Sequence, residues 1–248
     1  MTTSARIALV TGGMGGIGTA ISQRLHRDGF TVVVGCSPAS SRKSDWIGKQ
    51  LEAGYHFHCV DCDITDWENT RQTFELVREH IGPVDVLVNN AGITRDATFR
   101  KLTPENWHAV IDTNLSSLFN TTKQVIENML SRGWGRIINI SSINGQRGQF
   151  GQTNYSAAKA GIHGFTMALA REVSGKGVTI NTVSPGYVQT AMTAAIRPDI
   201  LEGMIAGIPV GRLGHPEEIA SIVAWLASDE SAYATGANFS VNGGMNMQ

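Results

Sequence analysis

The chain has 248 residues, of which 42% are hydrophobic and 17% are charged, and its formal net charge is -1. This composition indicates a globular protein with a full core, and the absence of a basic excess argues against bulk affinity for nucleic acid or anionic membranes. The chain has three cysteines, an odd and small number that is typical of a reducing compartment. It has no apolar run near the ~20 residues that span a membrane, and its N-terminus lacks a signal-peptide pattern. These features predict a cytoplasmic protein.

Short apolar runs alternate with amphipathic stretches along the whole chain. Several runs are continuous, as in Val84–Asn89, which fits strands buried on both faces of a parallel sheet. The alternation predicts an α/β fold with a doubly wound parallel sheet and helices on both faces. Because no repeat or linker interrupts it, residues 1–248 are predicted to form one domain. The expected strands are Ile7–Val10, Thr31–Gly35, Phe57–Val60, Val84–Asn89, Arg136–Ile140, Thr179–Ser184 and Asn238–Val241, and the expected helices are Ile17–Asp28, Asp66–His80, Pro104–Met129, Asn154–Glu172 and Pro216–Ser228.

The glycine-rich segment Thr11–Gly18 follows the first expected strand and opens the first expected helix. Glycines let the backbone turn sharply and bring its N–H groups against a pyrophosphate at a helix N-terminus. The spacing is T-G-x-x-x-G-x-G rather than G-x-G-x-x-G, and the strand–loop–helix context makes the pattern specific. The loop residues predicted to bind a dinucleotide are Gly12, Gly13, Met14, Gly15, Gly16, Ile17 and Gly18.

The end of the second expected strand bears on which dinucleotide binds. Enzymes that use NAD usually place an acidic residue there to hold the ribose hydroxyls, but this chain has none between Asp28 and Asp45. A small pocket without an acid, followed by Arg42 and Lys43, suits a 2′-phosphate. The sequence therefore predicts NADPH/NADP+ as cofactor, with Gly35, Ser37 and Arg42 beside it.

A possible metal site occurs near the third expected strand, where His56, His58, Cys59 and Cys62 lie within seven residues. On a strand the two histidines face one way and Cys59 faces the other, so one ion could not collect all four without breaking the strand. The strand interpretation is favoured, and no metal is expected.

Tyr155 and Lys159 lie four residues apart in the expected helix Asn154–Glu172, so their side chains share one face. An ammonium group beside a phenol favours the phenolate and lowers the phenol pKa from its usual ~10. A phenol tuned in this way can exchange a proton near neutral pH. The pair, with Ser142 upstream, is the candidate catalytic centre.

The segment from Thr190 to Arg212 interrupts the alternation of strands and helices. It is rich in Met, Ala, Ile and Gly and lies between the last two expected strands. Its position after the carboxyl end of a strand favours a mobile flap over a substrate. A surface helical hairpin is the alternative.

These motifs together resemble the short-chain dehydrogenase/reductase family over essentially the whole chain. The residues that carry the resemblance occur in the family's order and without a departure: Thr11–Gly18, Asn89–Gly92, Asn114, Ser142, Tyr155, Lys159 and Pro185–Gly186. The resemblance implies a Rossmann-type sheet of about seven strands. It also implies a homotetramer built on the helices that bear Asn114 and Tyr155.

The resemblance implies a role for each residue of the centre. Tyr155 is the general acid, Lys159 lowers the Tyr155 pKa and bonds the nicotinamide ribose, and Ser142 donates to the carbonyl oxygen of the substrate. Asn114 supports a water chain that returns protons through Lys159. Further nucleotide contacts implied are Asp63 at the adenine, Thr190 at the nicotinamide end, and Asn90, Ala91, Gly92, Tyr155, Pro185, Gly186 and Val188.

Within the family, the chain most resembles the acetoacetyl-CoA reductases of polyhydroxybutyrate synthesis. The stretches Gly12–Gly18, Gly92–Asp96, Arg132–Arg136 and Gly148–Tyr155 carry this closer match. It implies reduction of acetoacetyl-CoA to (R)-3-hydroxybutyryl-CoA with NADPH. The substrate contacts that it implies are Asp96, Lys101, Ser142, Gln149, Phe150, Gln152, Tyr155 and Tyr187.

Two alternatives stay open at this stage. The 3-oxoacyl-(acyl-carrier-protein) reductases of fatty acid synthesis share several of these stretches. Four cations near the expected entrance suit either an acidic carrier protein or the phosphates of CoA: Arg95, Arg100, Lys101 and Arg147. A catalytically silent nucleotide-binding scaffold is the other alternative. Such a protein is expected to lose its proton-transfer residues, but this chain keeps all four of them: Asn114, Ser142, Tyr155 and Lys159.

Overall fold

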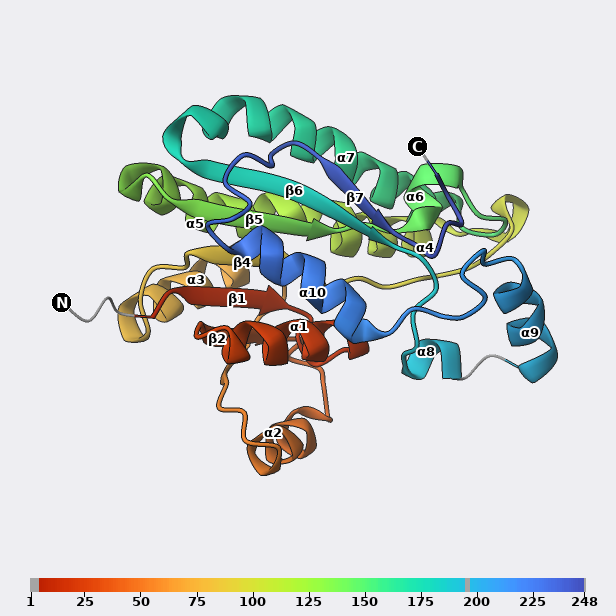
Figure 1. The fold of residues 1–248 in the computed structure, drawn as a ribbon, viewed down its shortest axis with the longest axis horizontal. Helices are drawn as coiled ribbons and strands as arrows, with labels where there is room; N and C mark the ends of the chain where they lie inside the picture. The colour runs from red at the N-terminus through yellow and green to blue at the C-terminus, as the bar shows by residue number, and fades with distance from the viewer. Residues whose placement is uncertain (1–4, 195–196, 248) are drawn as a thin grey trace.

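The computed structural model describes residues 5–194 and 197–247. Its seven-stranded sheet has the order β3-β2-β1-β4-β5-β6-β7, and every pairing is parallel. This confirms the predicted doubly wound α/β fold (Figure 1). The strands are β1 (Ile7–Thr11), β2 (Thr31–Cys36), β3 (His58–Asp61), β4 (Val86–Asn89), β5 (Gly135–Ile140), β6 (Val178–Pro185) and β7 (Asn238–Val241).

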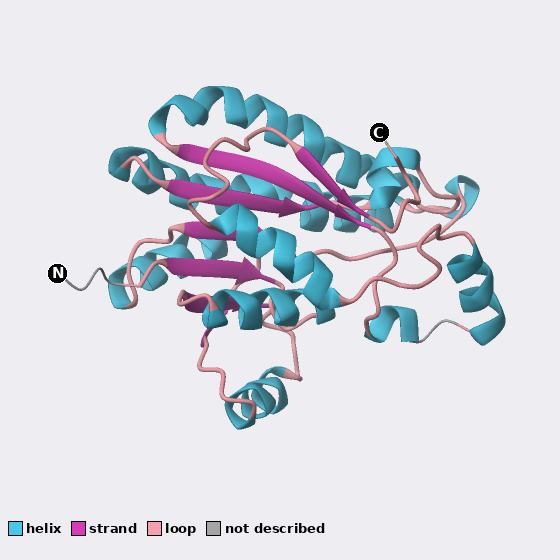
Figure 2. Cartoon of the chain, in the orientation of Figure 1, coloured by secondary structure: helices cyan, strands magenta, loops and turns pink. Residues whose placement is uncertain are grey.

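Helices cover both faces of the sheet (Figure 2). Alternate residues of β1 point to opposite faces, so Val10 and Leu9 belong to different hydrophobic cores. The core that contains Val10 is covered by α1 (Gly16–Arg27) and α10 (Pro216–Ala227). The core that contains Leu9 is covered by α3 (Trp67–His80), α5 (Ser117–Arg132) and α7 (Thr153–Val173).

The expected helix Pro104–Met129 is interrupted in the structure. It divides into α4 (Pro104–Ile111), a π-helical turn (Asp112–Ser116) and α5. The turn holds the fully buried Asn114, whose side chain bonds outside the helix, and π-turns of this kind occur where a helix admits such a contact. The remaining elements are α2 (Lys43–Glu52), α6 (Ile143–Arg147), α8 (Ala191–Ala194), α9 (Pro198–Ala206) and two short 3-10 turns, Phe99–Lys101 and Ser174–Lys176.

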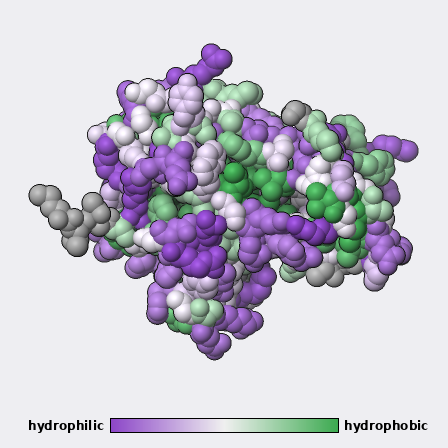
Figure 3. Space-filling view, in the orientation of Figure 1, coloured by the Kyte–Doolittle hydropathy of each residue, from purple (hydrophilic) through white to green (hydrophobic). Residues whose placement is uncertain are grey.

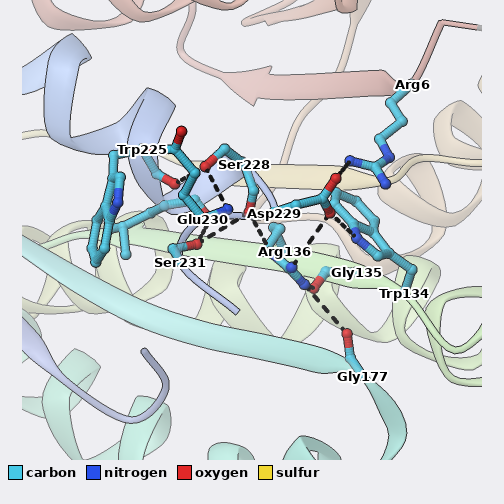
Figure 4. A network of polar contacts seen from close by, with 11 residues as sticks. Arg6, Trp134, Gly135, Arg136, Gly177, Trp225, Ser228, Asp229, Glu230 and Ser231 are labelled. Atoms are coloured by element: carbon cyan, nitrogen blue, oxygen red, sulfur yellow. Dashed lines mark hydrogen bonds and ion pairs between the residues drawn. The ribbon is translucent and has the colours of Figure 1, made fainter. Parts of the chain in front are cut away.

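A polar network fastens the amino-terminal edge of the sheet (Figure 4). The guanidinium groups of Arg6 and Arg136 lie 3.8 Å and 4.4 Å from the ring centroid of Trp134. Asp229, beyond the end of α10, accepts hydrogen bonds from Arg6 (3.0 Å) and from the Trp134 indole (2.8 Å). Arg136 is buried and donates to the backbone oxygens of Gly135, Gly177 and Ser228. The network therefore joins the starts of β1 and β5 to the end of α10.

The opposite, carboxyl-terminal edge carries the loops in which functional residues were predicted. Strand β1 pairs with β2 on one side and β4 on the other, so the chain order reverses there. A crevice at such a switch point is where open α/β sheets bind their ligands. Among the described residues, no helix has the length and apolar character needed to cross a membrane.

Candidate active site

The glycine-rich loop after β1 is shaped for close backbone contact. Gly12 has φ +61°, and a Cβ added to it would lie 2.9 Å from Cα of Ala91. A Cβ on Gly18 would lie 2.4 Å from the Gly12 oxygen, so larger residues are excluded at both positions. Gly15 and Gly16 are exposed at the N-terminus of α1, where first-turn amides lack helical partners. These residues therefore fit the pyrophosphate of a dinucleotide.

The segment after β4 braces this loop. The Asn90 side chain donates to the backbone oxygens of Thr11 (3.0 Å) and Gly12 (3.1 Å). The Thr11 hydroxyl oxygen accepts from the backbone N–H groups of Asn90 (3.0 Å) and Ala91 (3.1 Å). The predicted nucleotide residues Asn90 and Ala91 thus hold the loop through its backbone oxygens and the Thr11 hydroxyl, while within the loop the Gly15 N–H donates to the Gly12 oxygen at 3.0 Å.

Gly92 and Asn114 connect that segment to the proton-transfer residues. A Cβ added to Gly92 would lie 3.2 Å from Asn114 Oδ1 and 3.5 Å from Lys159 Nζ. The Asn114 amide forms two hydrogen bonds with the backbone of Ile93, each 2.8 Å long. The π-helical turn is therefore pinned to the segment that follows β4.

Tyr155, Lys159 and Ser142 converge at the end of β5. Lys159 Nζ lies 5.7 Å from the ring centroid of Tyr155 and donates to the backbone oxygen of Ile140 at 2.8 Å. The Ser142 hydroxyl is close enough to the Tyr155 phenol to act on its pKa. Ser142 is also the N-cap of α6, where its oxygen accepts from the Asn144 N–H at 3.1 Å. The cap fixes the serine hydroxyl beside the phenol.

Burial dominates the electrostatics of the centre. Burial raises the pKa of Tyr155, and the nearby Asp96 charge adds to this, while the Ser142 hydrogen bond opposes it. Burial also lowers the pKa of Lys159 to about 8, because a buried ammonium loses its hydration. Burial therefore sets the direction of the Tyr155 pKa shift in this structure, and the lowering of the phenol pKa expected from Lys159 stays a prediction. The phenol is protonated at neutral pH, which is the form that can donate a proton.

His163 supports the centre from behind and was not identified from the sequence. Its Nε2 lies 3.1 Å from the Ser141 hydroxyl and 3.3 Å from the Ser184 hydroxyl. Ser141 donates to the Lys159 backbone oxygen and Ser184 donates to Asn238 Oδ1, so Nε2 must carry the hydrogen that both serines accept. Burial lowers the pKa of His163. A polar ring one turn after Lys159, inside an otherwise apolar helix stretch, was the available signal.

The predicted 2′-phosphate pocket lies at the ends of β2 and β3. Gly35 is buried opposite Thr11, whereas Ser37 and Arg42 are exposed. The fold adds an acid that the loop sequence lacks, because Asp61 ends β3 opposite Cys36. Lys43 forms an ion pair with it, Nζ to Oδ1 2.8 Å.

The third strand carries Cys59, and Cys62 and Asp63 follow just after its end. Asp63 is exposed just beyond β3, and its Oδ1 accepts two hydrogen bonds from Thr65, at 3.0 Å from the backbone and 2.7 Å from the hydroxyl. Cys59 packs against the hydrophobic core on one face of the sheet and Cys62 lies within the core on the other. Within the described ranges, no three or more His, Cys, Asp or Glu side chains gather as metal ligands do.

The segment after β6 lies beside the phosphate loop. The methyl carbon of Thr190 would be 2.8 Å from a Cβ on Gly16. The Gly186 N–H bonds the Val241 oxygen (2.9 Å), and the buried Val188 forms an isolated parallel bridge with Gly214. Thr190 therefore lies beside the phosphate loop, and the nucleotide contacts of Pro185, Gly186 and Val188 stay predictions.

The residues just before and just after the predicted flap are hydrogen-bonded to each other. The Gln189 N–H donates to Gly214 (2.8 Å) and the Gly214 N–H donates to Tyr187 (2.9 Å), which joins its two stems. Between them stand α8 and α9, while residues 195–196 lie outside the described part. Figure 3 shows apolar surface on this side of the molecule, and Ile200 and Val210 are among the exposed apolar residues. Whether the segment moves as a flap stays a prediction.

Two of the predicted substrate contacts, Asp96 and Gln152, are hydrogen-bonded to each other, and several of the others are exposed. The Gln152 amide accepts from Asn144 and donates to Asp96, each at 2.9 Å, so both of its ends have protein partners. Tyr187 is half-buried. Phe150 is 86% exposed, too open to close a pocket in this conformation. Gln149 and Lys101 are exposed as well.

Comparison with known proteins gives consistent matches. The family model described as short chain dehydrogenase matches residues 6–201. An acetoacetyl-CoA reductase of Cupriavidus necator is 64% identical over 242 residues, 98% of each chain. An acetoacetyl-CoA reductase of Allochromatium vinosum is 55% identical over 98% of this chain and 99% of that protein. A 3-oxoacyl-(acyl-carrier-protein) reductase of Pseudomonas aeruginosa is 45% identical over the full length of both.

Proposed function

This chain belongs to the short-chain dehydrogenase family, and we propose that it reduces acetoacetyl-CoA to (R)-3-hydroxybutyryl-CoA with NADPH in polyhydroxybutyrate biosynthesis. The observation that carries the proposal is the convergence of Ser142, Tyr155 and Lys159 beside a loop fit for pyrophosphate. The choice of substrate is supported by the extent of the likeness to acetoacetyl-CoA reductases, which exceeds that to the carrier-protein reductases. A cytoplasmic location is part of the same proposal.

The chemistry divides between cofactor and protein. When bound, the nicotinamide supplies the hydride. Tyr155, kept protonated by burial, donates a proton to the carbonyl oxygen of the substrate. Ser142 donates a hydrogen bond to the same oxygen and stabilises the charge that develops there. Lys159, with a pKa of about 8, returns the proton to Tyr155. Asn114 holds the neighbouring backbone in place and is proposed to support the water chain that supplies Lys159.

The nucleotide would be held at three places. Amides at the start of α1 bind the pyrophosphate. The exposed guanidinium of Arg42 binds the 2′-phosphate, while the Lys43–Asp61 pair beside it stays neutral as a unit. The exposed carboxylate of Asp63 meets the adenine amine.

The substrate would enter between the segment after β4 and the predicted flap. We place Asp96, Gln149, Phe150, Gln152 and Tyr187 around the acyl group. Four exposed cations that flank the centre in the sequence suit the phosphates of CoA: Arg95, Arg100, Lys101 and Arg147.

A homotetramer of single-domain subunits is proposed from the family. Phe119 on α5 and Met167 on α7 are 57% and 54% exposed, which supports an apolar contact between copies on these helices. Light scattering on the purified protein is expected to give four times the chain mass of 26.6 kDa. A mass of one chain at micromolar concentration contradicts this.

One experiment tests the reaction and the substrate together. NADPH oxidation is measured with acetoacetyl-CoA and with acetoacetyl-carrier protein, and the product is analysed for chirality. We expect the larger kcat/KM with acetoacetyl-CoA and the (R) product. A large preference for the carrier protein favours fatty acid synthesis instead, and no oxidation with any β-ketoacyl thioester favours a silent scaffold.

A further inference from the structure

Helix α2 is attached to the body of the molecule by few contacts. It stands below the layered core in Figure 1, and Gln50 is its only buried residue in the described structure. Gln50 accepts a hydrogen bond from Gln23 of α1 at 2.8 Å. A cavity of ≈ 20 Å³ remains between α2 and the start of β3, so apolar packing does not fill this contact. The position of α2 therefore depends on one core-packed ring, Trp46, and a small number of specific bonds.

One of those bonds leads from α2 to the phosphate loop. The Trp46 indole Nε1 donates to the Thr19 hydroxyl at 3.0 Å, and the Thr19 hydroxyl donates to the Gly13 backbone oxygen at 3.3 Å. The indole ring stacks on Phe57 with centroids 5.6 Å apart. Because Gly13 lies inside the loop, these two hydrogen bonds connect the helix directly to the backbone that faces a pyrophosphate.

The same tryptophan also holds the start of α2. Its backbone N–H donates to the Arg42 backbone oxygen at 2.9 Å. Arg42 is exposed and enters no ion pair in the described part of the chain, whereas Lys43 is paired with Asp61. Arg42 is thus the cation at this end of β2 that remains available for an anion. The bonds run without a break from Arg42 through Trp46 and Thr19 to Gly13.

We propose that Trp46 and Thr19 are positioning residues for nucleotide selection. They fix the separation between the Arg42 backbone and the phosphate loop, so that one nucleotide can engage the loop with its pyrophosphate and Arg42 with its 2′-phosphate. The inference rests on the proposed use of NADPH. NAD+ has no 2′-phosphate, so its affinity does not depend on where α2 places Arg42.

The test is nucleotide binding to the full-length protein by isothermal titration calorimetry, with NADP+ and NAD+ as probes. Trp46→Phe keeps an aromatic ring against Phe57 and removes only the donor. The lost hydrogen bond is worth roughly 0.5–1.5 kcal/mol, so we expect the Kd for NADP+ to rise about 2- to 12-fold. The Kd for NAD+ is expected to stay within about twofold, because that ligand makes no contact that α2 positions.

Three further variants make the result specific. Thr19→Val removes the hydroxyl at nearly constant shape, and the double variant is expected to bind NADP+ no more weakly than the weaker single variant, since both remove one chain of bonds. Trp225→Phe is the matched control, because Trp225 is also half-buried and packs edge-on against an aromatic ring, Phe239. It is expected to change neither Kd.

The outcomes separate the two proposals. If the parent protein binds NADP+ no more tightly than NAD+, the NADPH assignment fails and this inference fails with it. If the parent prefers NADP+ and Arg42→Ala weakens that preference, but Trp46→Phe and Thr19→Val do not, only the positioning role is overturned. Equal weakening of both nucleotides by Trp46→Phe also overturns it, because that result indicates general loosening of the loop.

Discussion

Lys159 Nζ donates to the backbone oxygen of Ile140 at 2.8 Å, with the lysine only 3% exposed. The bond ties the amine of α7 to the last residue of β5, directly before the serine pair that ends in Ser142. A buried ammonium with a carbonyl partner but no carboxylate is poorly compensated, which is why burial lowers its pKa to about 8. Lys159 is thus fixed in position and able to change charge near neutral pH.

The pH dependence of reduction follows from this pKa. Below about pH 8 Lys159 carries the proton that it returns to Tyr155, and above it the proton is lost. We expect kcat/KM for acetoacetyl-CoA to be level from pH 6.5 to 7.5 and to fall up to tenfold per unit well above pH 8. Initial rates in buffers of constant ionic strength measure this. A level profile extending beyond pH 9.5 contradicts the assignment.

Lys159→Met is expected to lower activity without lowering stability at pH 7. The native pKa of about 8 lies below the unfolded value of 10.5, so the unfolded chain binds more protons between these values, and this lysine's contribution to stability rises with pH across that window. At pH 7 the variant is therefore expected to be no less stable, with a gain of up to about 3 kcal/mol. The gain should vanish above pH 10.5, while kcat falls by about 10²- to 10⁴-fold at every pH. Urea unfolding at both pH values checks this, and a loss of stability at pH 7 would contradict it.

Tyr155→Phe and Ser142→Ala are expected to act on the chemical step. Removing the proton donor should lower kcat by roughly 10²- to 10⁴-fold, and removing the serine hydroxyl by roughly 10²- to 10³-fold. The NADP+ affinity of Ser142→Ala should remain within about twofold, because the serine hydroxyl does not support the phosphate loop. Single-turnover rates together with NADP+ titration distinguish these effects. A variant of Tyr155 with more than a tenth of the parent rate rules out its role as the acid.

His163 is expected to influence the centre through Ser141. His163→Leu removes the N–H shared by two serines and should lower kcat about 2- to 12-fold, with KM little changed. His163→Gln offers an amide N–H at nearly the position of Nε2 and is expected to restore most of the rate. If both variants lose activity equally while their melting temperatures stay equal, the hydrogen bond to Ser141 is not the cause.

Arg136 is expected to contribute to stability and not to catalysis. Arg136→Met leaves three backbone oxygens without their donor, and each unsatisfied buried group costs about 1 kcal/mol or more, so we expect a loss of about 2–4 kcal/mol. Arg6→Met is the matched control, because Arg6 touches the same indole but its side chain is 39% exposed, and it should lose about 1 kcal/mol or less. Denaturant unfolding measures both. Unchanged stability in the Arg136 variant contradicts the prediction.

Much of the fold could be predicted because its signals are local. The apolar runs predicted all seven strands to within two residues at either end. Five of these strands, β1, β2, β4, β5 and β6, are buried as such runs require. The π-helical turn at Asp112–Ser116 was missed, because its cause is the contact between Asn114 and the distant Ile93. Helix α2 was missed because it buries one residue and so carries no long apolar stripe.

The amino-acid sequence by itself determined the residues that can do the chemistry and their order along the chain. Spacing on one helix places Tyr155 and Lys159 on a common face, and glycine alone fits the backbone at Gly12. Only the tertiary structure decided the protonation of that pair, because burial by surrounding elements raises one pKa and lowers the other. It also brought Asp61 beside the pocket that the loop sequence had left without an acid. Desolvation and contacts between distant strands depend on three-dimensional packing, which no local pattern records.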